Sequence, residues 1–332
     1  MQIALRLRLS YNRRMSAVAT TSLEKQLTPL PWEWFDFAPP PEASSPDFPG
    51  LQVSTGTVLM DHRPVPYRVI EMAGDSHRPK LMLMHGMGLN IATFHGIAAY
   101  LLATHDLVMP DYTSFSLPHA WPHGGVSVKV MAETVCRVAD ALKIERLALA
   151  GNSLGGGMCL MAALQHPDRI GKLVLTNPAC YPQELPWMYR LTRVPIVGEL
   201  FMTLSPADRF IAGIEFIGYV DKSRFVLPLR QRYRAQLSHR ASRYRLMDMI
   251  RHLPGNERDL SFAVHVRRLC EITQPVLLLW GMNDPLLDPE SGPRLAKDLP
   301  NCRFITFADL GHMPHEEAPE RVGPIIAGFL NG

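Results

Sequence analysis

The chain of 332 residues is 47% hydrophobic and 20% charged, a composition typical of a globular protein with a large apolar core. Its net charge of +3 is too small to indicate nucleic acid as a partner. Its five cysteines are scattered, odd in number and free of C-x-x-C spacing. This argues against both a disulfide framework and a zinc site, and it is typical of a reducing compartment.

The N-terminal end is rich in arginine and in Ser/Thr, and it contains no acid before Glu24. Such a stretch resembles an organelle transit peptide. We favour the simpler interpretation, a disordered or misassigned start with Met15 as the true first residue. No apolar run reaches the length of about 18 residues that a transmembrane helix needs. We therefore expect a cytoplasmic protein, with a mitochondrion or another organelle as the alternative.

Residues 29–49 hold seven prolines mixed with tryptophan and phenylalanine. Proline removes backbone donors and fixes φ, so this composition predicts an extended segment. The aromatic side chains indicate that the segment lies against the surface of the folded domain. We assign residues 1–50 to an N-terminal extension.

From residue 51 onward, short apolar runs alternate with longer amphipathic stretches. The first two runs, Leu51–Met60 and Pro66–Met72, predict a β-hairpin. Six further runs predict strands buried on both faces: Lys80–Met84, His105–Met109, Arg146–Ala150, Lys172–Thr176, Pro275–Trp280 and Arg303–Phe307. Helical spacing is found between them in Ile91–Ala103, Val128–Leu142, Leu154–His166, Pro289–Leu299 and Pro319–Leu330. This alternation predicts βαβ units and a mostly parallel sheet.

Residues 178–272 interrupt the alternation, because they have helical character and no comparable strand pattern. A structureless loop of this length is uncommon inside a compact domain. The sequence therefore predicts a helical insertion over residues 178–272, within a core formed by residues 51–177 and 273–332.

The strongest functional motif is Gly-Asn-Ser-Leu-Gly at residues 151–155. It follows the strand Arg146–Ala150 and precedes a helix, which is the setting of the G-x-S-x-G nucleophile elbow. A sharp turn raises the serine hydroxyl above the sheet, and glycines beside it avoid collisions with neighbouring backbone. Ser153 is therefore the candidate nucleophile.

A serine hydroxyl needs a base, and His312 is the candidate among the 13 histidines. It follows the last predicted strand, where the chain order Ser, Asp/Glu, His would place the base. His315 is the competing candidate, and we interpret it as the start of the final helix.

The acid of such a triad should follow a strand between the serine and the histidine. Asp284 lies in WGMNDP, directly after the strand Pro275–Trp280. Asp288 and Asp309 are weaker candidates. Asn177 also follows a strand, but it is neutral and cannot stabilise an imidazolium by charge.

An oxyanion requires two backbone donors. The amide of Leu154, directly after the nucleophile, is the first candidate. The turn at residues 85–88 (HGMG) follows the first parallel strand, and the amide of Met87 is the second. We expect His85 to be structural, because it precedes this turn.

Together, HGMG at 85–88, GNSLGG at 151–156, WGMNDP at 280–285 and GHMPHEEAPE at 311–320 resemble the α/β-hydrolase superfamily over residues 51–332. The resemblance implies the α/β-hydrolase fold: a mostly parallel eight-stranded sheet with helices on both faces. It further implies that residues 178–272 form a helical cap inserted after strand 6.

The same resemblance implies a catalytic triad of Ser153, Asp284 and His312. It also implies an oxyanion hole formed by the amides of Met87 and Leu154. Such a mechanism needs no metal and no organic cofactor.

Within the superfamily, the chain resembles capped esterases, monoacylglycerol-lipase-like enzymes and C–C hydrolases of meta-cleavage products. Haloalkane dehalogenases and epoxide hydrolases use aspartate as nucleophile, so Ser153 argues against both. We expect a serine esterase for a small to medium, apolar ester. A C–C hydrolase is the second hypothesis, because HGMGLN is poorer in Gly and Ser than the usual oxyanion loop of those enzymes. A non-catalytic ligand receptor is the third, since all three triad positions are intact.

Two features of the predicted cap leave alternatives open. One set of apolar side chains either lines an acyl pocket or forms the cap's own packing face: Met188, Leu191, Val194, Ile196, Val197, Leu200, Phe201 and Met202. Between Lys222 and Arg251, nine basic residues accompany a single acid, Asp248. We favour arginines that lie over the core and pair with acids elsewhere. The alternative is contact with an anionic partner, such as a membrane surface.

Overall fold

The computed structural model describes most of the chain, namely residues 29–36, 50–60, 63–74, 77–112, 128–181, 187–252 and 266–332. Two predictions concern residues outside these ranges: those for the arginine-rich start and for most of the proline-rich segment.

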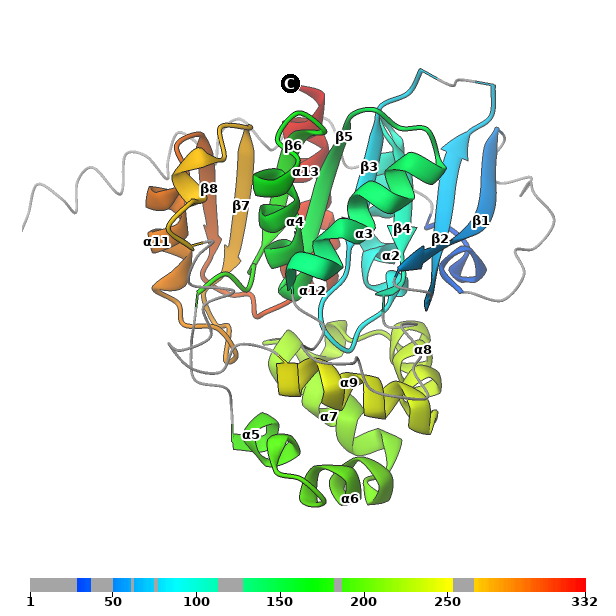
Figure 1. The fold of residues 1–332 in the computed structure, drawn as a ribbon, viewed down its shortest axis with the longest axis vertical. Coiled ribbons are helices and arrows are strands. Elements are labelled where there is room, and N and C mark those ends of the chain that lie inside the picture. The colour runs from blue at the N-terminus through cyan, green and yellow to red at the C-terminus, as the bar shows by residue number, and fades with distance from the viewer. Residues whose placement is uncertain are drawn as a thin grey trace, which may run out of the picture.

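The described residues contain one eight-stranded sheet (Figure 1). Its strands are β1 (Leu51–Met60), β2 (Arg63–Met72), β3 (Lys80–Met84), β4 (Asp106–Pro110), β5 (Leu147–Asn152), β6 (Ile170–Thr176), β7 (Val276–Gly281) and β8 (Cys302–Phe307). The spatial order is β1-β2-β4-β3-β5-β6-β7-β8. β1 and β2 pair antiparallel, as do β2 and β4, and all other neighbours are parallel. The predicted hairpin and the mostly parallel sheet are confirmed.

Helices cover both faces of the sheet (Figure 1). One face carries α3 (Val128–Ala141), α4 (Leu154–Gln165) and α11 (Ser291–Asp298), whose apolar side chains form one core layer with the strands. The other face carries α2 (His95–Leu102) and α13 (Pro319–Asn331), which form a second layer. Strands enclosed in this way need apolar residues on both faces, and β4, β5 and β7 are buried throughout.

In the described part of the chain, five α-helices lie between β6 and β7 and pack at one end of the sheet (Figure 1). They are α5 (Trp187–Arg193), α6 (Val197–Leu204), α7 (Ala207–Gly218), α8 (Leu227–Ser238) and α9 (Arg240–His252). We call residues 187–252 the helical insertion. None of the helices in the described part of the chain is long and apolar enough to cross a bilayer.

Three expectations require correction. β8 is an edge strand with only Phe307 buried, so it is not enclosed on both faces. The helix expected over Ile91–Ala103 is divided into a 3-10 turn, Ile91–Phe94, and α2, because Asn90 caps the turn through the amide of Ala92.

The third correction concerns the segment before the sheet, which we expected to be extended. Trp32–Phe35 forms a 3-10 turn instead. The aromatic side chains do pack against the domain, as expected, since Trp34 and Phe35 are buried in the second core layer. The ring of Trp32 stacks on His95 at a centroid distance of 3.5 Å.

Candidate active site

Ser153 lies in the turn between β5 and α4 with φ +55° and ψ −121°. Such a backbone conformation is strained for any residue with a side chain, and it persists only where neighbours hold it. The Ser153 amide donates to the carbonyl of Thr176 at 3.1 Å, and its carbonyl accepts from the amides of Gly157 and Ala179. The predicted elbow is therefore present in the backbone.

The glycines of the motif allow this turn to sit against β3. A Cβ atom on Gly155 would lie 2.0 Å from the carbonyl oxygen of Met84, and one on Gly151 would lie 2.5 Å from the backbone of Gly155. Neither contact can be relieved by moving a flexible side chain, because both involve backbone. Glycine is thus required for α4 to begin so close to the sheet.

Asp284 and His312 are joined directly. His312 Nδ1 lies 2.6 Å from Asp284 Oδ2, and both side chains are buried. The other carboxylate oxygen, Oδ1, accepts from the amides of Leu286 at 2.8 Å and Leu287 at 3.0 Å. Burial by itself would raise the pKa of Asp284, but the charge of His312 and these hydrogen bonds lower it below its usual value.

Asn177 is a residue of the site that the sequence analysis dismissed. Its Nδ2 donates to Asp284 Oδ2 at 2.8 Å, and its side chain also exchanges hydrogen bonds with the backbone of Gly281. The sequence signal was its position at the end of a parallel strand. A neutral side chain at that position cannot serve as the acid, but the amide of Asn177 supplies a donor that orients the carboxylate of Asp284.

Asn152 connects the serine turn with the histidine loop. Its Nδ2 donates to the carbonyl of His312 at 3.1 Å and to that of Thr176 at 3.0 Å. The structure thus brings the loop of His312 next to the residue that precedes Ser153. The hydrogen bond between Ser153 and His312 stays a prediction.

The loop after β3 lies beside Ser153. A Cβ atom on Gly86 would be 3.5 Å from Cβ of Ser153, and the amide of Leu89 donates to the carbonyl of Gly86 in a turn that contains Met87. Leu154 is the first residue of α4, where the amides of a helix have no intrahelical partner. Both predicted oxyanion donors therefore come from backbone around the nucleophile, and their joint role stays a prediction.

The competing candidates have partners elsewhere. Asp309 is exposed and pairs with Arg321. Asp288 accepts from the amide of Glu290. His315 is buried with Nε2 2.9 Å from Thr93 Oγ1, and burial followed by the charge of His312 lowers its pKa to about 3.

His85, which we expected to be structural, is also buried. Its ring stacks on Tyr112 at a centroid distance of 3.9 Å, and its Nδ1 lies 2.8 Å from the carbonyl oxygen of Gly86.

A cavity of about 450 Å³ lies between the helical insertion and the loop after β3. Met87 and Gly88 form its wall near the nucleophile, and Ser153 itself is not part of the lining. The insertion contributes mainly apolar walls, among them Phe201, Met202 and Ile250. Of the residues expected to line an acyl pocket, Phe201 and Met202 do so, whereas Val194, Ile196, Val197 and Leu200 are exposed to solvent.

Helices α8 and α9 rest directly on the same loop. Gln236 of α8 contacts the side chain of Asn90 at 2.7 Å and the carbonyl of Leu89 at 3.3 Å. A Cβ atom on Gly88 would lie 3.2 Å from the side chain of Leu246 in α9. The insertion therefore covers the end of the sheet at which Ser153 lies.

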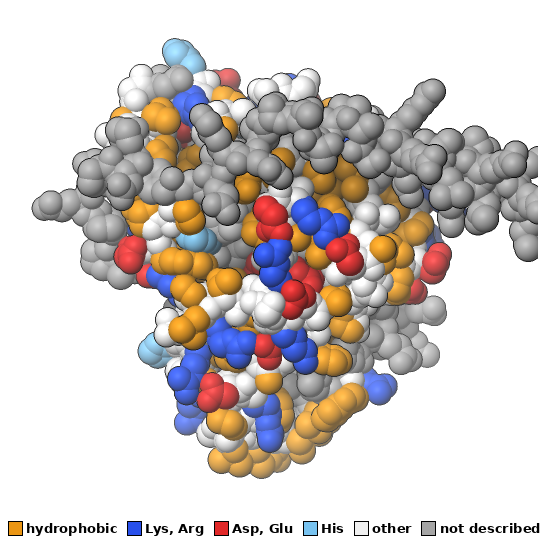
Figure 2. Space-filling view, turned by 180° about the vertical axis from the view of Figure 1, so that it is seen from behind, with side chains coloured by type: hydrophobic (Ala, Val, Ile, Leu, Met, Phe, Trp, Pro, Cys, Tyr) orange, Lys and Arg blue, Asp and Glu red, His pale blue; other side chains and the backbone are white. Residues whose placement is uncertain are grey.

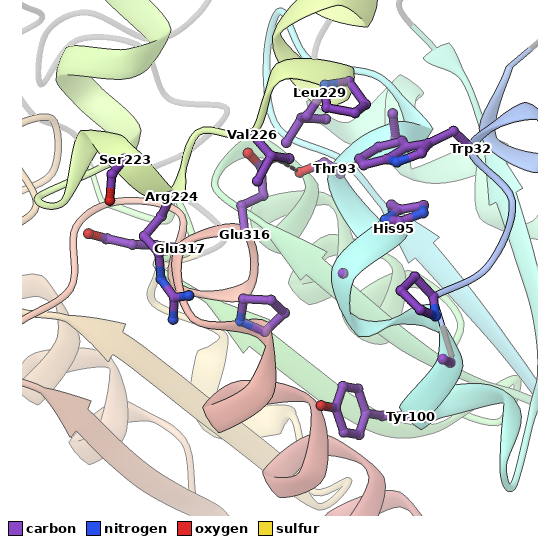
Figure 3. Close-up of a pocket in the computed structure, with 16 residues that line it drawn as sticks. Trp32, Thr93, His95, Tyr100, Ser223, Arg224, Val226, Leu229, Glu316 and Glu317 are labelled. Carbon is purple, nitrogen blue, oxygen red and sulfur yellow. Dashed lines mark hydrogen bonds between the residues drawn. The ribbon is translucent and has the colours of Figure 1, made fainter. Parts of the chain in front are cut away.

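A second cavity, of about 480 Å³, lies between α2, the start of α8 and the residues after His312 (Figure 3). Glu316 and Thr93 face one another at its wall, joined by a hydrogen bond. The buried Glu316 carboxylate also accepts from the hydroxyls of Tyr219 and Tyr233 in the insertion, the latter at 2.6 Å. Burial raises the pKa of Glu316, although the three hydroxyl donors and the charge of His312 oppose the shift.

Glu317 links the insertion to the loop of His312. Its Oε1 accepts from the amides of Val220 at 2.8 Å and Asp221 at 2.7 Å, and its Oε2 accepts from the amide of Gly311 at 2.8 Å. Neither glutamate stands out in the sequence, because all their partners except Gly311 lie far away in the chain.

Most arginines between residues 222 and 251 have partners. Ion pairs to acids are formed by Arg224, Arg230, Arg232, Arg234 and Arg251, the acids being Glu320, Glu215, Asp36, Asp208 and Glu199. Arg243 donates to the carbonyls of Met202 and Ser205. These contacts agree with the favoured interpretation that the basic stretch covers apolar surface and pairs with acids elsewhere.

Within the described ranges, no group of three His, Cys, Asp or Glu side chains could hold a metal ion.

The chain matches known proteins over most of its length. The model of the alpha/beta hydrolase family matches residues 81–324. A 2-hydroxy-6-oxononadienedioate/2-hydroxy-6-oxononatrienedioate hydrolase of Paraburkholderia phymatum is 28% identical over 263 residues, which cover 75% of this chain and 86% of that protein.

Solved structures share the fold. A loop variant of a haloalkane dehalogenase from Bradyrhizobium elkanii superimposes with a TM-score of 0.69 at 20% identity, covering 84% of this chain and 97% of the other. An enol-lactonase from Burkholderia xenovorans gives a TM-score of 0.67 at 17% identity, covering 83% and 100%.

Proposed function

Because this chain belongs to the alpha/beta hydrolase family, we propose that it is a serine hydrolase that cleaves a carboxylic ester, with Ser153 as nucleophile. The observation that carries the proposal is the buried contact of 2.6 Å between His312 Nδ1 and Asp284 Oδ2. The histidine so oriented belongs to a loop that is hydrogen-bonded to Asn152, the residue before the strained serine. A nucleophile, a base and a group that orients the base are the parts of a serine triad.

The proposed reaction proceeds through an acyl-enzyme. His312 Nε2 takes the proton of Ser153 while Oγ attacks the ester carbonyl, and the amides of Met87 and Leu154 stabilise the oxyanion. The intermediate collapses, and the alcohol leaves with the proton from His312. Water then attacks the acyl-enzyme, with His312 again as base, and releases the carboxylic acid. Asp284 stays ionised throughout and stabilises the imidazolium.

The helical insertion is proposed to act as a cap that binds the acyl part of the substrate. In support, its cavity borders Met87 and Gly88, and Arg209 is the only charged side chain among the described residues that line it. An apolar lining favours hydrocarbon over charged groups. We therefore propose a small to medium, apolar acyl ester as substrate, and no cofactor.

The test is replacement of Ser153 by Ala together with covalent labelling. Loss of a triad nucleophile removes roughly six orders of magnitude in rate in well-studied serine proteases. We expect the S153A variant to hydrolyse a soluble aryl ester at the background rate, and a fluorophosphonate to label the parent chain at Ser153 only. Activity within tenfold of the parent would contradict the assignment, provided circular dichroism shows that the variant is folded.

A C–C hydrolase is the second candidate, because the relative from Paraburkholderia phymatum is named as a hydrolase of a dioate. Such a substrate has two carboxylates, which require cationic or hydrogen-bonding partners when buried. The described lining of the mainly apolar cavity holds one cationic side chain, Arg209, for two carboxylates, with Tyr189 and Thr192 as its hydroxyl groups, so the ester proposal is preferred. Comparing kcat/KM for an ester series with that for one meta-cleavage product separates the two. A receptor without catalysis would show no turnover of either.

A further inference from the structure

The end of the helical insertion exposes large apolar side chains, and Figure 2 shows them along the lower end of the molecule with Lys and Arg side chains nearby. Contiguous apolar patches on a protein surface mark interaction sites, whereas scattered single residues do not. The group lies on α5, on α6 and in the turn between them, and we call it the α5–α6 apolar surface: Trp187, Val194, Ile196, Val197, Leu200 and Leu204.

The exposed residues share one side of α6. Val197, Leu200 and Leu204 follow one another at helical spacing, so they form a stripe on one face. The opposite face is the one that packs, since Met202 is buried and a Cβ atom on Gly198 would lie 2.3 Å from the carbonyl oxygen of Thr192. The outer stripe is thus not needed to hold α6 in the fold, and 75% of Leu204 is exposed.

Positive charge flanks this surface. Among the described residues, Arg190 and Arg209 form no ion pair with an acid, whereas the nearby Glu199 and Asp208 are both paired. Arg190 lies one helical turn after Trp187, and Arg209 lines the same cavity as Trp187. The apolar surface therefore has a cationic border, which is complementary to anionic lipid head groups.

Arg240 adds a third positive charge near the end of α6. It lies over the ring of Tyr244, whose hydroxyl is 2.9 Å from Thr203 Oγ1, beside Leu204. The contacts of Arg240 among the described residues are with Tyr244, whose hydroxyl accepts from its guanidinium at 3.2 Å.

The cavity connects this surface with the candidate active site. Trp187, which is 68% exposed, lines it together with Phe201, and Met87 and Gly88 line it next to Ser153. The cavity therefore extends from the α5–α6 apolar surface to the loop beside Ser153, and its mainly apolar walls suit an acyl chain.

We propose that the α5–α6 apolar surface docks on an anionic lipid bilayer, and that the cavity takes the acyl chain of an ester held in that bilayer. Docking depends on the exposed residues alone, whereas the substrate class rests on the proposed hydrolase function. A second copy of the chain fits this surface less well, because a stable dimer buries about 20 to 30 residues on each side and the apolar group is much smaller.

The test compares three forms of the full chain, each carrying the S153A substitution so that no turnover occurs. They are the parent, Leu204→Glu, and the matched control Leu59→Glu, which introduces the same charge at a leucine that is 62% exposed on β1. Binding is measured by co-sedimentation with vesicles of phosphatidylcholine containing 30% phosphatidylglycerol, and with pure phosphatidylcholine. All three forms keep the arginine-rich first residues, so any contribution from those residues cancels.

We expect the parent and Leu59→Glu to bind the anionic vesicles alike, and Leu204→Glu to bind about tenfold more weakly, because a charge replaces an inserted apolar side chain. The parent should bind pure phosphatidylcholine vesicles more weakly than anionic ones. Its binding to anionic vesicles should fall as salt rises, because the Debye screening length shortens from about 10 Å at 0.1 M to about 3 Å at 1 M. Thermal melting verifies that both variants are folded.

Equal binding by Leu204→Glu and Leu59→Glu would overturn the proposal. Failure of the parent to bind either kind of vesicle would overturn it as well. If the parent does not bind vesicles but forms a dimer, and Leu204→Glu is monomeric, the surface is assigned to a second copy of the chain instead. The chain with Ser153 intact separates the two proposals. Vesicle binding without hydrolysis of any ester would support docking and contradict the hydrolase function. Hydrolysis of a soluble ester without vesicle binding would support the hydrolase function and contradict docking.

Discussion

The carboxylate of Asp284 has four donors arranged around two oxygens. Oδ2 accepts from His312 and Asn177, and Oδ1 accepts from the amides of Leu286 and Leu287. This arrangement keeps the group ionised and fixes the plane of the carboxylate, so that one lone pair points at His312 Nδ1. The side-chain amide of an asparagine at this position has one acceptor oxygen. It could accept the donors at one of the two oxygen positions, but its N–H groups would face the donors at the other.

The first prediction at this scale is that Asp284→Asn abolishes most activity on a soluble ester. The amide cannot hold His312 in the required tautomer or stabilise its positive charge, and a comparable change in a serine protease lowers the rate by about 10⁴. The measurement is kcat/KM, with Asp309→Asn as the matched control, because Asp309 is exposed and pairs with Arg321 at the surface. If Asp309→Asn proves the more damaging change, the acid is misassigned.

At the same scale, the sequence pattern points to Asp284 and His312, which the structure joins, but not to the residues that orient them. Asp284 and His312 follow strands in a known order, so pattern alone locates them. Asn177 and Asn152 act through partners 107 and 160 residues away. Such pairing depends on which strands become neighbours in the sheet, and residue type by itself does not reveal it.

At the scale of elements, the contact between α4 and β3 depends on a missing side chain. Gly155 and Gly328 are both helical glycines, but a Cβ atom on Gly155 meets the Met84 carbonyl at 2.0 Å, whereas one on Gly328 meets nothing within 4 Å. We expect Gly155→Ala to destabilise the protein by about 1–3 kcal/mol through overpacking and to displace Ser153, with loss of activity. Gly328→Ala should instead stabilise by about 1 kcal/mol, since alanine favours a helix.

Thermal unfolding of the two glycine variants, with ester hydrolysis measured in parallel, tests this difference. Equal unfolding midpoints of Gly155→Ala and Gly328→Ala would contradict this prediction, because they would show that α4 can move away from β3 without loss of stability.

The central strands were predictable because strands enclosed on both faces are continuous apolar runs. The hairpin β1–β2 was predictable from its β-branched and apolar residues. What failed was the environment of β8. Its run resembles the others, but Arg303 and Thr306 are exposed because β8 is the last strand of the sheet. Strand order is a long-range property, so a local pattern cannot distinguish an edge strand from a central one. The predicted α/β-hydrolase fold is nevertheless confirmed.

At the scale of the whole molecule, the helical insertion and the sheet are joined through two buried carboxylates. Glu317 binds the backbone of both Gly311 and Val220, and Glu316 receives hydroxyls from Tyr219 and Tyr233. The same short helix, α12 (Pro314–Glu317), directly follows His312. The attachment of the insertion is therefore coupled to the position of the candidate base.

The last prediction concerns the pH dependence of this attachment. Burial raises the pKa of Glu316 above its value in the unfolded chain, so the folded state favours the protonated form. The resulting stabilisation is fully present below the unfolded pKa of about 4.3 and is lost as pH rises through the folded pKa. The charged and titratable neighbours are His312, which opposes the shift, His315, which is neutral with a pKa of about 3, the carboxylate of Glu317, and the hydroxyls of Tyr219 and Tyr233. Burial raises the pKa of both tyrosines well above its usual value, so they stay neutral over this range.

Replacing Glu316 with Gln keeps the shape and one acceptor oxygen but removes the titration. We therefore expect the unfolding midpoint of Glu316→Gln to rise relative to that of the parent as pH increases from about 4.5 to 8. Glu320→Gln is the matched control, because that carboxylate is exposed and pairs with Arg224 at the surface. It should follow the parent across the same range. Midpoints of Glu316→Gln and parent that stay a constant distance apart would show that the buried carboxyl does not titrate with folding, and that the junction between insertion and sheet is insensitive to its charge.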